Sequence, residues 1–128
     1  RRGVETILVL PARNDSAAVG AMSRATYAEL AEAGVKIFEF LGGLLHAKTL
    51  VADGEAALIG SANMDRRSLE LNFENNILLY CRNTAAAIRD RQHAYLSNAR
   101  EVSRGEMRKR PMRRILWQNL LTIFAPIF

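Results

Sequence analysis

The stretch HAKTLVADGEAALIGSAN, residues 46–63, decides how the rest of this chain is interpreted. At its centre, Asp53-Gly54 is a strong signal for a tight hairpin turn, because both residue types accept the positive φ that such turns require. We therefore expect a strand over residues 45–52 and a returning strand over residues 56–60. This hairpin would bring the two ends of the stretch close together.

Alternation along the two strands groups four polar side chains. Residues two apart on a strand share a face, so His46 and Lys48 are expected to project together. Ser61 and Asn63 do the same if the returning strand stays extended. Asp53 stands at an odd offset from His46, so we expect its carboxylate to fix the turn rather than to touch a substrate.

An imidazole, an ammonium, a hydroxyl and a carboxamide in one small region suit attack on a phosphorus atom. Lys48 supplies a point charge, and Asn63 supplies directed hydrogen bonds, to the non-bridging oxygens of a phosphate. His46 would act as the nucleophile or as a proton donor. A carboxylate on its other ring nitrogen would orient the ring, and Glu74 in the segment LNFENN is the best candidate.

The flanking segments predict an α/β fold. Strands are expected over residues 4–10, 35–40 and 76–80, with one helix from a cap at Ser16 to Ala33 and another from a cap at Asn83 or Thr84 to about Val102. Gly34 lies where a glycine commonly ends a helix. The first strand-helix-strand segment implies parallel strands. We expect a mixed, mostly parallel β-sheet flanked by helices, arranged as an α/β/α sandwich.

Basic charge is concentrated near the C-terminus. Of the 18 Lys and Arg side chains, six lie in residues 104–114 with a single acidic residue, and residues 115–128 are uncharged and rich in large apolar groups. A nucleic-acid-binding protein more often spreads its basic charge over the working face of the fold, so this pattern favours a membrane surface. We therefore divide the chain into a folded domain, residues 1–103, and a tail, residues 104–128.

The tail is expected to lie in a membrane interface. Its uncharged end is too short to cross a hydrocarbon core of about 30 Å as a helix. The residues expected at the membrane surface are Arg108, Lys109, Arg110, Arg113, Arg114 and Trp117. The alternative is that the tail packs on another part of the protein.

The cysteine and histidine content argues against several kinds of site. Cys81 is the only cysteine, so no internal disulfide can form, and His46 and His93 are the only histidines, so no zinc-ligand spacing exists. We expect a reducing compartment, no metal and no cofactor. No apolar run of about 18 residues is present, so we expect no spanning segment within this chain and leave open one upstream.

Residues 46–63 follow the pattern HxKxxxxDxxxxxxGSxN and so resemble the phospholipase D superfamily at every fixed position. The wider sequence LLHAKTLVADGEAALIGSANMDRRSLELNFENN is similar to the bacterial cardiolipin synthase branch, and this similarity extends from Gly3 to the basic tail. The resemblance implies the fold of a phospholipase D half-domain.

The resemblance also implies metal-independent phosphatidyl transfer through a phosphohistidine. In the cardiolipin synthase reaction, two phosphatidylglycerols would be joined and glycerol released, without a cofactor. Carried over by position, the roles are His46 as nucleophile or acid/base, Lys48, Ser61 and Asn63 in the phosphate pocket, Glu74 orienting His46, and Asp53 in the scaffold.

One feature departs from the family pattern. Active sites of this superfamily combine two such motifs across a pseudo-twofold axis, whereas this chain carries one. His93 lies in QHAYL, without a lysine two residues on or a following GSxN, so it cannot supply the second motif. The second half would come from a missing N-terminal part or from a homodimer partner, and the isolated chain would be inactive without it.

Two alternatives remain open. The first is another enzyme of the same superfamily with the same pocket: a phospholipase, a phosphatidylserine synthase or a single-motif dimeric nuclease. The second is a non-catalytic half-domain that binds anionic lipid without turnover. The preferred interpretation has phosphatidylglycerol as substrate and an anionic membrane surface as partner, with no nucleic acid. It places the protein at the bacterial inner membrane, either peripheral or anchored by a segment outside this chain.

Overall fold

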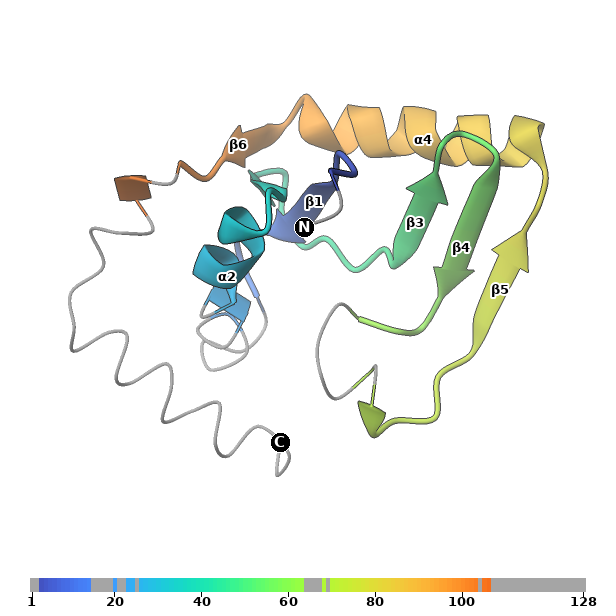
Figure 1. The fold of residues 1–128 in the computed structure, drawn as a ribbon, viewed down its shortest axis with the longest axis horizontal. Helices are drawn as coiled ribbons and strands as arrows, with labels where there is room; N and C mark the ends of the chain where they lie inside the picture. Colours follow the sequence, from blue (N-terminus) through green and yellow to red (C-terminus); the bar gives the residue numbers. More distant parts are fainter. Residues whose placement is uncertain are drawn as a thin grey trace. The chain divides into compact units, whose positions relative to one another are not determined.

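The computed structural model describes residues 3–14, 20, 23–24, 26–63, 68, 70–103 and 105–106. The chain divides into two compact units, one of residues 1–45 and 98–128 and the other of residues 46–97. In chain order the elements are β1 (Ile7–Pro11), α2 (Tyr27–Glu32), β2 (Lys36–Phe40), β3 (Thr49–Ala52), β4 (Ala56–Gly60), β5 (Asn76–Leu79), α4 (Arg82–Leu96) and β6 (Ala99–Glu101) (Figure 1).

The first unit contains a three-stranded sheet in the order β1-β2-β6. β1 runs parallel to β2, with Ile7 opposite Lys36, as the strand-helix-strand pattern predicted. β6 runs antiparallel to β2 on its other side, with Phe38 opposite Glu101. This sheet therefore joins the beginning of the chain to a segment that follows the whole second unit.

The core of the first unit lies where α2 packs against β2. Tyr27 and Ile37 are each only 1% exposed, and Ala31 and Val102 belong to the same buried cluster. Because the cluster includes Val102, which follows β6, the helix, the central strand and the late strand share one core. Burying a side chain of the size of Ile37 or Val102 contributes roughly 1.5–3 kcal/mol.

A Schellman motif at Gly34 terminates α2, as the position of this glycine in the sequence predicted. Gly34 has a φ of +93°. Its N–H donates to the carbonyl of Ala31 (3.1 Å), and the N–H of Val35 donates to the carbonyl of Leu30 (3.0 Å). These two bonds satisfy carbonyls that the helix end would otherwise leave unpaired. The predicted cap at Ser16 lies outside the described residues.

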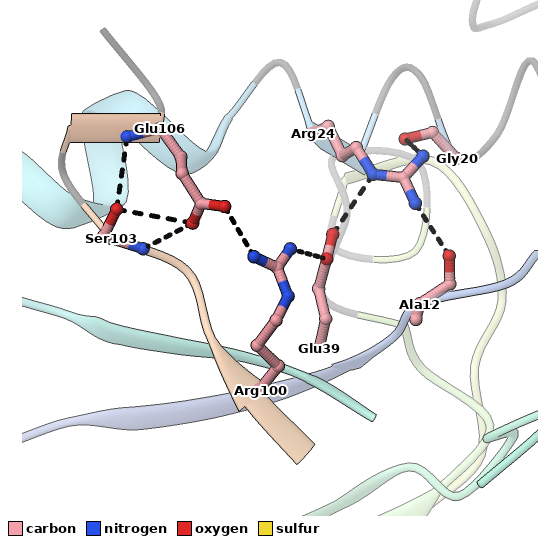
Figure 2. A network of polar contacts seen from close by, with 7 residues as sticks. All are labelled: Ala12, Gly20, Arg24, Glu39, Arg100, Ser103 and Glu106. Atoms are coloured by element: carbon pink, nitrogen blue, oxygen red, sulfur yellow. Dashed lines mark hydrogen bonds and ion pairs between the residues drawn. The ribbon is translucent and has the colours of Figure 1, made fainter. Parts of the chain in front are cut away.

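A network of charged groups centred on Glu39 connects distant segments of the first unit (Figure 2). Glu39, on β2, is 8% exposed and lies between two guanidinium groups. Arg24 Nε approaches its carboxylate at 3.2 Å and Arg100 Nη2 at 3.0 Å. Arg24 also donates to the carbonyl of Ala12 (2.7 Å), and Arg100 pairs with Glu106 (2.6 Å). Two cations thus compensate the burial of one carboxylate.

The second unit contains a three-stranded antiparallel sheet in the order β3-β4-β5. α4 packs against β3 and β4, and Gln92 Nε2 donates to Thr49 Oγ1 at 3.0 Å. Ala57 on β4 and Ala85 on α4 are completely buried, and side chains this small allow the helix to lie close to the sheet. Cys81, at the N-cap of α4, is exposed.

The expectation of one mostly parallel sheet is wrong, although the sheet of the first unit is mixed. The α/β character holds, but the described strands form two small sheets in which β1–β2 is the parallel pair and the other pairs are antiparallel. Parallel neighbours require a long crossover connection, whereas the short turn between β3 and β4 reverses the chain at once. The hairpin therefore fixes β3 and β4 as an antiparallel pair.

Several element boundaries also differ from the prediction. The first strand begins at Ile7 and β3 at Thr49, both later than expected, and α4 has Cys81 rather than Asn83 or Thr84 at its N-cap. The last helix ends at Leu96 instead of continuing to about Val102, and residues 99–101 form β6. In the described part of the chain, no helix is long and apolar enough to cross a membrane. The outer part of the predicted tail, residues 107–128, lies outside the described residues.

Replacing Glu39 by alanine should lower the free energy of unfolding by roughly 1–3 kcal/mol, because Arg24 and Arg100 lose a shared, largely buried partner. Urea denaturation followed by circular dichroism measures this change. The matched control is Glu5→Ala. Glu5 pairs with Lys36, which lies on β2 as Glu39 does, but this pair is well exposed, so its loss should cost less than the loss of Glu39. Equal effects of the two substitutions would contradict a structural role of the network.

Candidate active site

The antiparallel sheet of the second unit brings the candidate residues to one of its ends. His46 and Lys48 immediately precede β3, and Ser61 and Asn63 immediately follow β4. Glu74 lies two residues before β5 begins. Because β3 and β5 run opposite to β4, all five positions fall at the same end of the sheet, although they come from three different segments (Figure 1).

Asp53 lies at the opposite end of this sheet, in the turn between β3 and β4. Its φ is +52° and that of Gly54 is +71°, and the N–H of Glu55 donates to the carbonyl of Ala52 at 3.0 Å. Two consecutive positive φ values are typical of a type I′ turn, which Asp-Gly favours. The position of Asp53 therefore agrees with a scaffold role and separates it from His46.

The segment that carries His46 and Lys48 continues the sheet without forming a full strand. The N–H of Gly60 donates to the carbonyl of Lys48 at 3.1 Å, which extends the ladder by one pair beyond β3. The Lys48 ammonium donates to the carbonyl of His46 at 3.1 Å. His46 is exposed and Lys48 is half-buried. The Lys48 ammonium is thus bonded to the backbone of its own segment, whereas the His46 imidazole is accessible to a ligand.

Ser61 and Glu74 are in direct contact. Ser61 Oγ donates to Glu74 Oε2 at 2.5 Å and accepts a hydrogen bond from the N–H of Asn75 at 2.9 Å. The N–H of Ser61 donates to the carbonyl of Asn75 at 3.0 Å. The loop after β4 and the loop before β5 are therefore joined by both backbone and side-chain bonds.

The surroundings of Glu74 stabilise its charged form. Hydrogen bonds to the carboxylate hold its pKa below the ordinary value, with Ser61 as the largest cause and Ser68, Asn72 and the positive charge of Lys48 adding to it, while desolvation acts in the opposite direction. Asn72 Nδ2 donates to Glu74 Oε1 at 3.3 Å. Glu74 is consequently an anion at neutral pH.

The structure does not pair Glu74 with His46. In the part of the chain that the structure describes, its hydrogen-bond partners are the side chains of Ser61, Ser68 and Asn72. Its predicted role in orienting the His46 ring therefore stays a prediction. These partners were missed by sequence reasoning, and the polar alternation of LNFENN was the only signal that pointed to Asn72.

Gly60 allows the β4 and β5 backbones to approach at the site. A Cβ atom at this position would lie 2.0 Å from Asn76 Oδ1 and 2.5 Å from the backbone carbonyl oxygen of Asn75. The Asn76 side chain also accepts the N–H of Ala62, at 3.5 Å. Since one of the two close neighbours is backbone, a side chain at residue 60 would push the loops apart.

The assembled groups can hold an anion and do not form a metal site. Among the described residues, no three His, Cys, Asp or Glu side chains gather as metal ligands would. The Lys48 ammonium and the Asn63 carboxamide can donate to phosphate oxygens. The exposed imidazole of His46 can attack or protonate a group held between them.

His93 and a set of expected membrane-surface residues were also singled out from the sequence. His93 is exposed in the last turn of α4. The expected membrane-surface residues lie outside the described part of the chain; they are Arg108, Lys109, Arg110, Arg113, Arg114 and Trp117.

Comparison with known proteins identifies relatives. The family model described as "Cardiolipin synthase, PLD-like domain" matches residues 1–95. Proteins named Cardiolipin synthase A from Cronobacter sakazakii (strain ATCC BAA-894), Salmonella arizonae and Salmonella newport are each 41% identical to this chain over 127 residues, which is 99% of the chain and 26% of each relative. The chain thus spans about a quarter of the length of these relatives. No solved structure gives a significant match.

Replacing Gly60 by alanine should separate the two loops and destabilise the protein by roughly 1–3 kcal/mol, the usual cost of overpacking. Urea denaturation measures the loss, and amide hydrogen exchange at Ser61 and Asn75 should become faster. Gly105→Ala is the matched control, because a Cβ there meets only Ser103 Oγ, at 3.9 Å. A Gly60→Ala protein with wild-type stability and exchange would show that the close approach is unimportant.

Proposed function

The chain belongs to the PLD-like domain family of cardiolipin synthase, as its signature predicted, and from this premise we propose that it supplies one of two halves of a phosphatidyltransferase site. The proposed reaction joins two phosphatidylglycerols into cardiolipin and releases glycerol. The observation that carries the proposal is the convergence of His46, Lys48, Ser61, Asn63 and Glu74 at one end of a single sheet.

The first proposed step forms a covalent intermediate. A ring nitrogen of one histidine attacks the phosphorus of a phosphatidylglycerol, and a P–N bond forms as the P–O bond to the glycerol headgroup breaks. A second histidine donates a proton to the departing glycerol oxygen. His46 is one of these two histidines.

The second step returns the phosphatidyl group to an alcohol. The hydroxyl of another phosphatidylglycerol gives its proton to the acid/base histidine and attacks phosphorus, and the P–N bond breaks. Lys48 and Asn63 balance the charge on the non-bridging oxygens in both steps. Neither step requires a metal or a cofactor.

The second histidine must come from outside the motif of residues 46–63. In this proposal it belongs to another part of a longer protein or to a homodimer partner, and the 128-residue chain alone has no synthase activity unless it dimerises. The lipid substrate places the reaction at the surface of the bacterial inner membrane. The basic and apolar tail, residues 104–128, would attract anionic headgroups there.

The test is an assay of the full-length protein with phosphatidylglycerol vesicles in the presence of EDTA. Cardiolipin and glycerol should form in equal amounts. His46→Ala should reduce turnover by at least about 1000-fold, as removal of a covalent or acid/base group does. The matched control is His93→Ala, which changes an exposed helix residue and should leave turnover unchanged.

Three outcomes would contradict the proposal. Loss of turnover in EDTA would indicate a metal-dependent reaction. Cleavage of DNA without lipid turnover would indicate the dimeric nuclease, and vesicle binding without turnover would indicate a lipid-binding half-domain.

A further inference from the structure

The Ser61 hydroxyl has one proton, and the structure commits it to Glu74. A serine side chain offers one donor and two acceptor lone pairs. The donor points to Glu74 Oε2 at 2.5 Å, while the other nearby acceptor, the Asn75 carbonyl, is at 3.5 Å. One lone pair accepts the N–H of Asn75 at 2.9 Å. The hydroxyl is therefore engaged both as a donor and as an acceptor.

A phosphate diester offers only acceptors to its neighbours. Ser61 could hold such a ligand only by withdrawing its proton from Glu74, and this would replace one charge-assisted hydrogen bond by another. Lys48 and Asn63 have donors for the phosphate without that exchange. The pocket consequently has no need of Ser61 as a ligand.

We propose that Ser61 is a positioning residue: its hydroxyl fixes the Glu74 carboxylate at the edge of the site and does not bind the substrate phosphate. This inference rests on the proposed function and on the prediction from the sequence that Glu74 orients His46. The GSxN signature then contains two kinds of residue. Asn63 binds the phosphate, and Ser61 connects the loop after β4 to the Glu74 carboxylate, which lies before β5.

The remaining contacts of Glu74 show why this bond matters. Of the carboxylate's other neighbours, Asn72 is at 3.3 Å, Ser68 is a neutral donor, and Lys48 acts through its charge. Bonds from a donor to an ionised acceptor are stronger when short. Without the Ser61 hydroxyl, the carboxylate of this half-buried residue would lose its bond at 2.5 Å and could rotate.

The first test titrates the Glu74 carboxyl carbon by NMR in the 128-residue chain, and it does not depend on activity. In Ser61→Ala the pKa of Glu74 should rise toward the ordinary glutamate value, because the largest cause of its lowering is gone. Ser61→Thr keeps the hydroxyl and should keep the low pKa. Ser97→Ala, which removes a hydroxyl bonded to the Ala94 carbonyl at the end of α4, is the matched control and should leave the titration unchanged.

The pH dependence of stability follows from the same bond. The folded-state pKa of Glu74 is lowered, so its contribution is present above the pKa of the unfolded chain and is lost as pH falls through the folded pKa. The stability difference between wild type and Ser61→Ala should therefore be larger at pH 7 than at a pH below both pKa values. An equal difference at both pH values would contradict the proposed bond.

The second test separates positioning from phosphate binding in the full-length protein. Ser61→Ala should lower kcat by up to about 100-fold, the effect of a misplaced catalytic group, and leave KM for phosphatidylglycerol little changed. Ser61→Thr should restore kcat. A raised KM with unchanged kcat and an unchanged Glu74 titration would make Ser61 a phosphate ligand and overturn the proposal.

The two tests also separate this inference from the proposed function. If the wild-type protein turns over no lipid, the proposed function fails, while the Glu74 titration still decides whether Ser61 holds the carboxylate. If Ser61→Ala does not fold, Ser61→Cys takes its place, because a thiol is only a weak donor. A raised Glu74 pKa with a lowered kcat supports the proposal, and an unchanged Glu74 pKa with an unchanged kcat overturns it.

Discussion

The arrangement at the site depends on how closely the β4 and β5 backbones approach at Gly60. A hydrogen atom is the only side chain that fits beside the Asn75 carbonyl and the Asn76 carboxamide. That contact continues the ladder into the paired bonds between Ser61 and Asn75, and these in turn place the Ser61 hydroxyl against Glu74. The close backbone approach at Gly60 therefore determines where the negative charge of Glu74 lies.

The two units use carboxylates in different ways. Glu39 is buried between Arg24 and Arg100, so its charge is cancelled locally and serves to join segments of the fold. Glu74 is held mainly by neutral hydroxyl and amide donors, with Lys48 contributing as a charge. A carboxylate stabilised by neutral donors keeps its negative field, and such a field can act on a nearby imidazole or ammonium group.

Local sequence signals predicted the parts of the structure that local physics determines. Asp53-Gly54 predicted the hairpin, and Gly34 predicted the end of α2, because both depend on backbone dihedral angles. β6 was missed, since the three residues 99–101 carry no strand pattern and are held by pairing with β2. The grouping of His46 and Lys48 with Ser61 and Asn63 followed from the hairpin. The hydrogen bond between Ser61 and Glu74 depends on the geometry of two loops, which the alternation of polar residues does not predict.

The pairing of β6 with β2 also has a consequence for biosynthesis. The second unit is inserted within the first, and the Leu41 N–H bonded to the Asn98 carbonyl at 2.9 Å brings the two junctions together. During synthesis, β2 can therefore pair with β6 only after the whole second unit has emerged from the ribosome. During that interval one edge of β2 is unpaired, and Glu39 lacks Arg100, which is 61 residues further along the chain. A nascent chain at this stage would be most exposed to mispairing or to chaperone capture, and prompt folding of the insert would shorten the loop that remains to be closed.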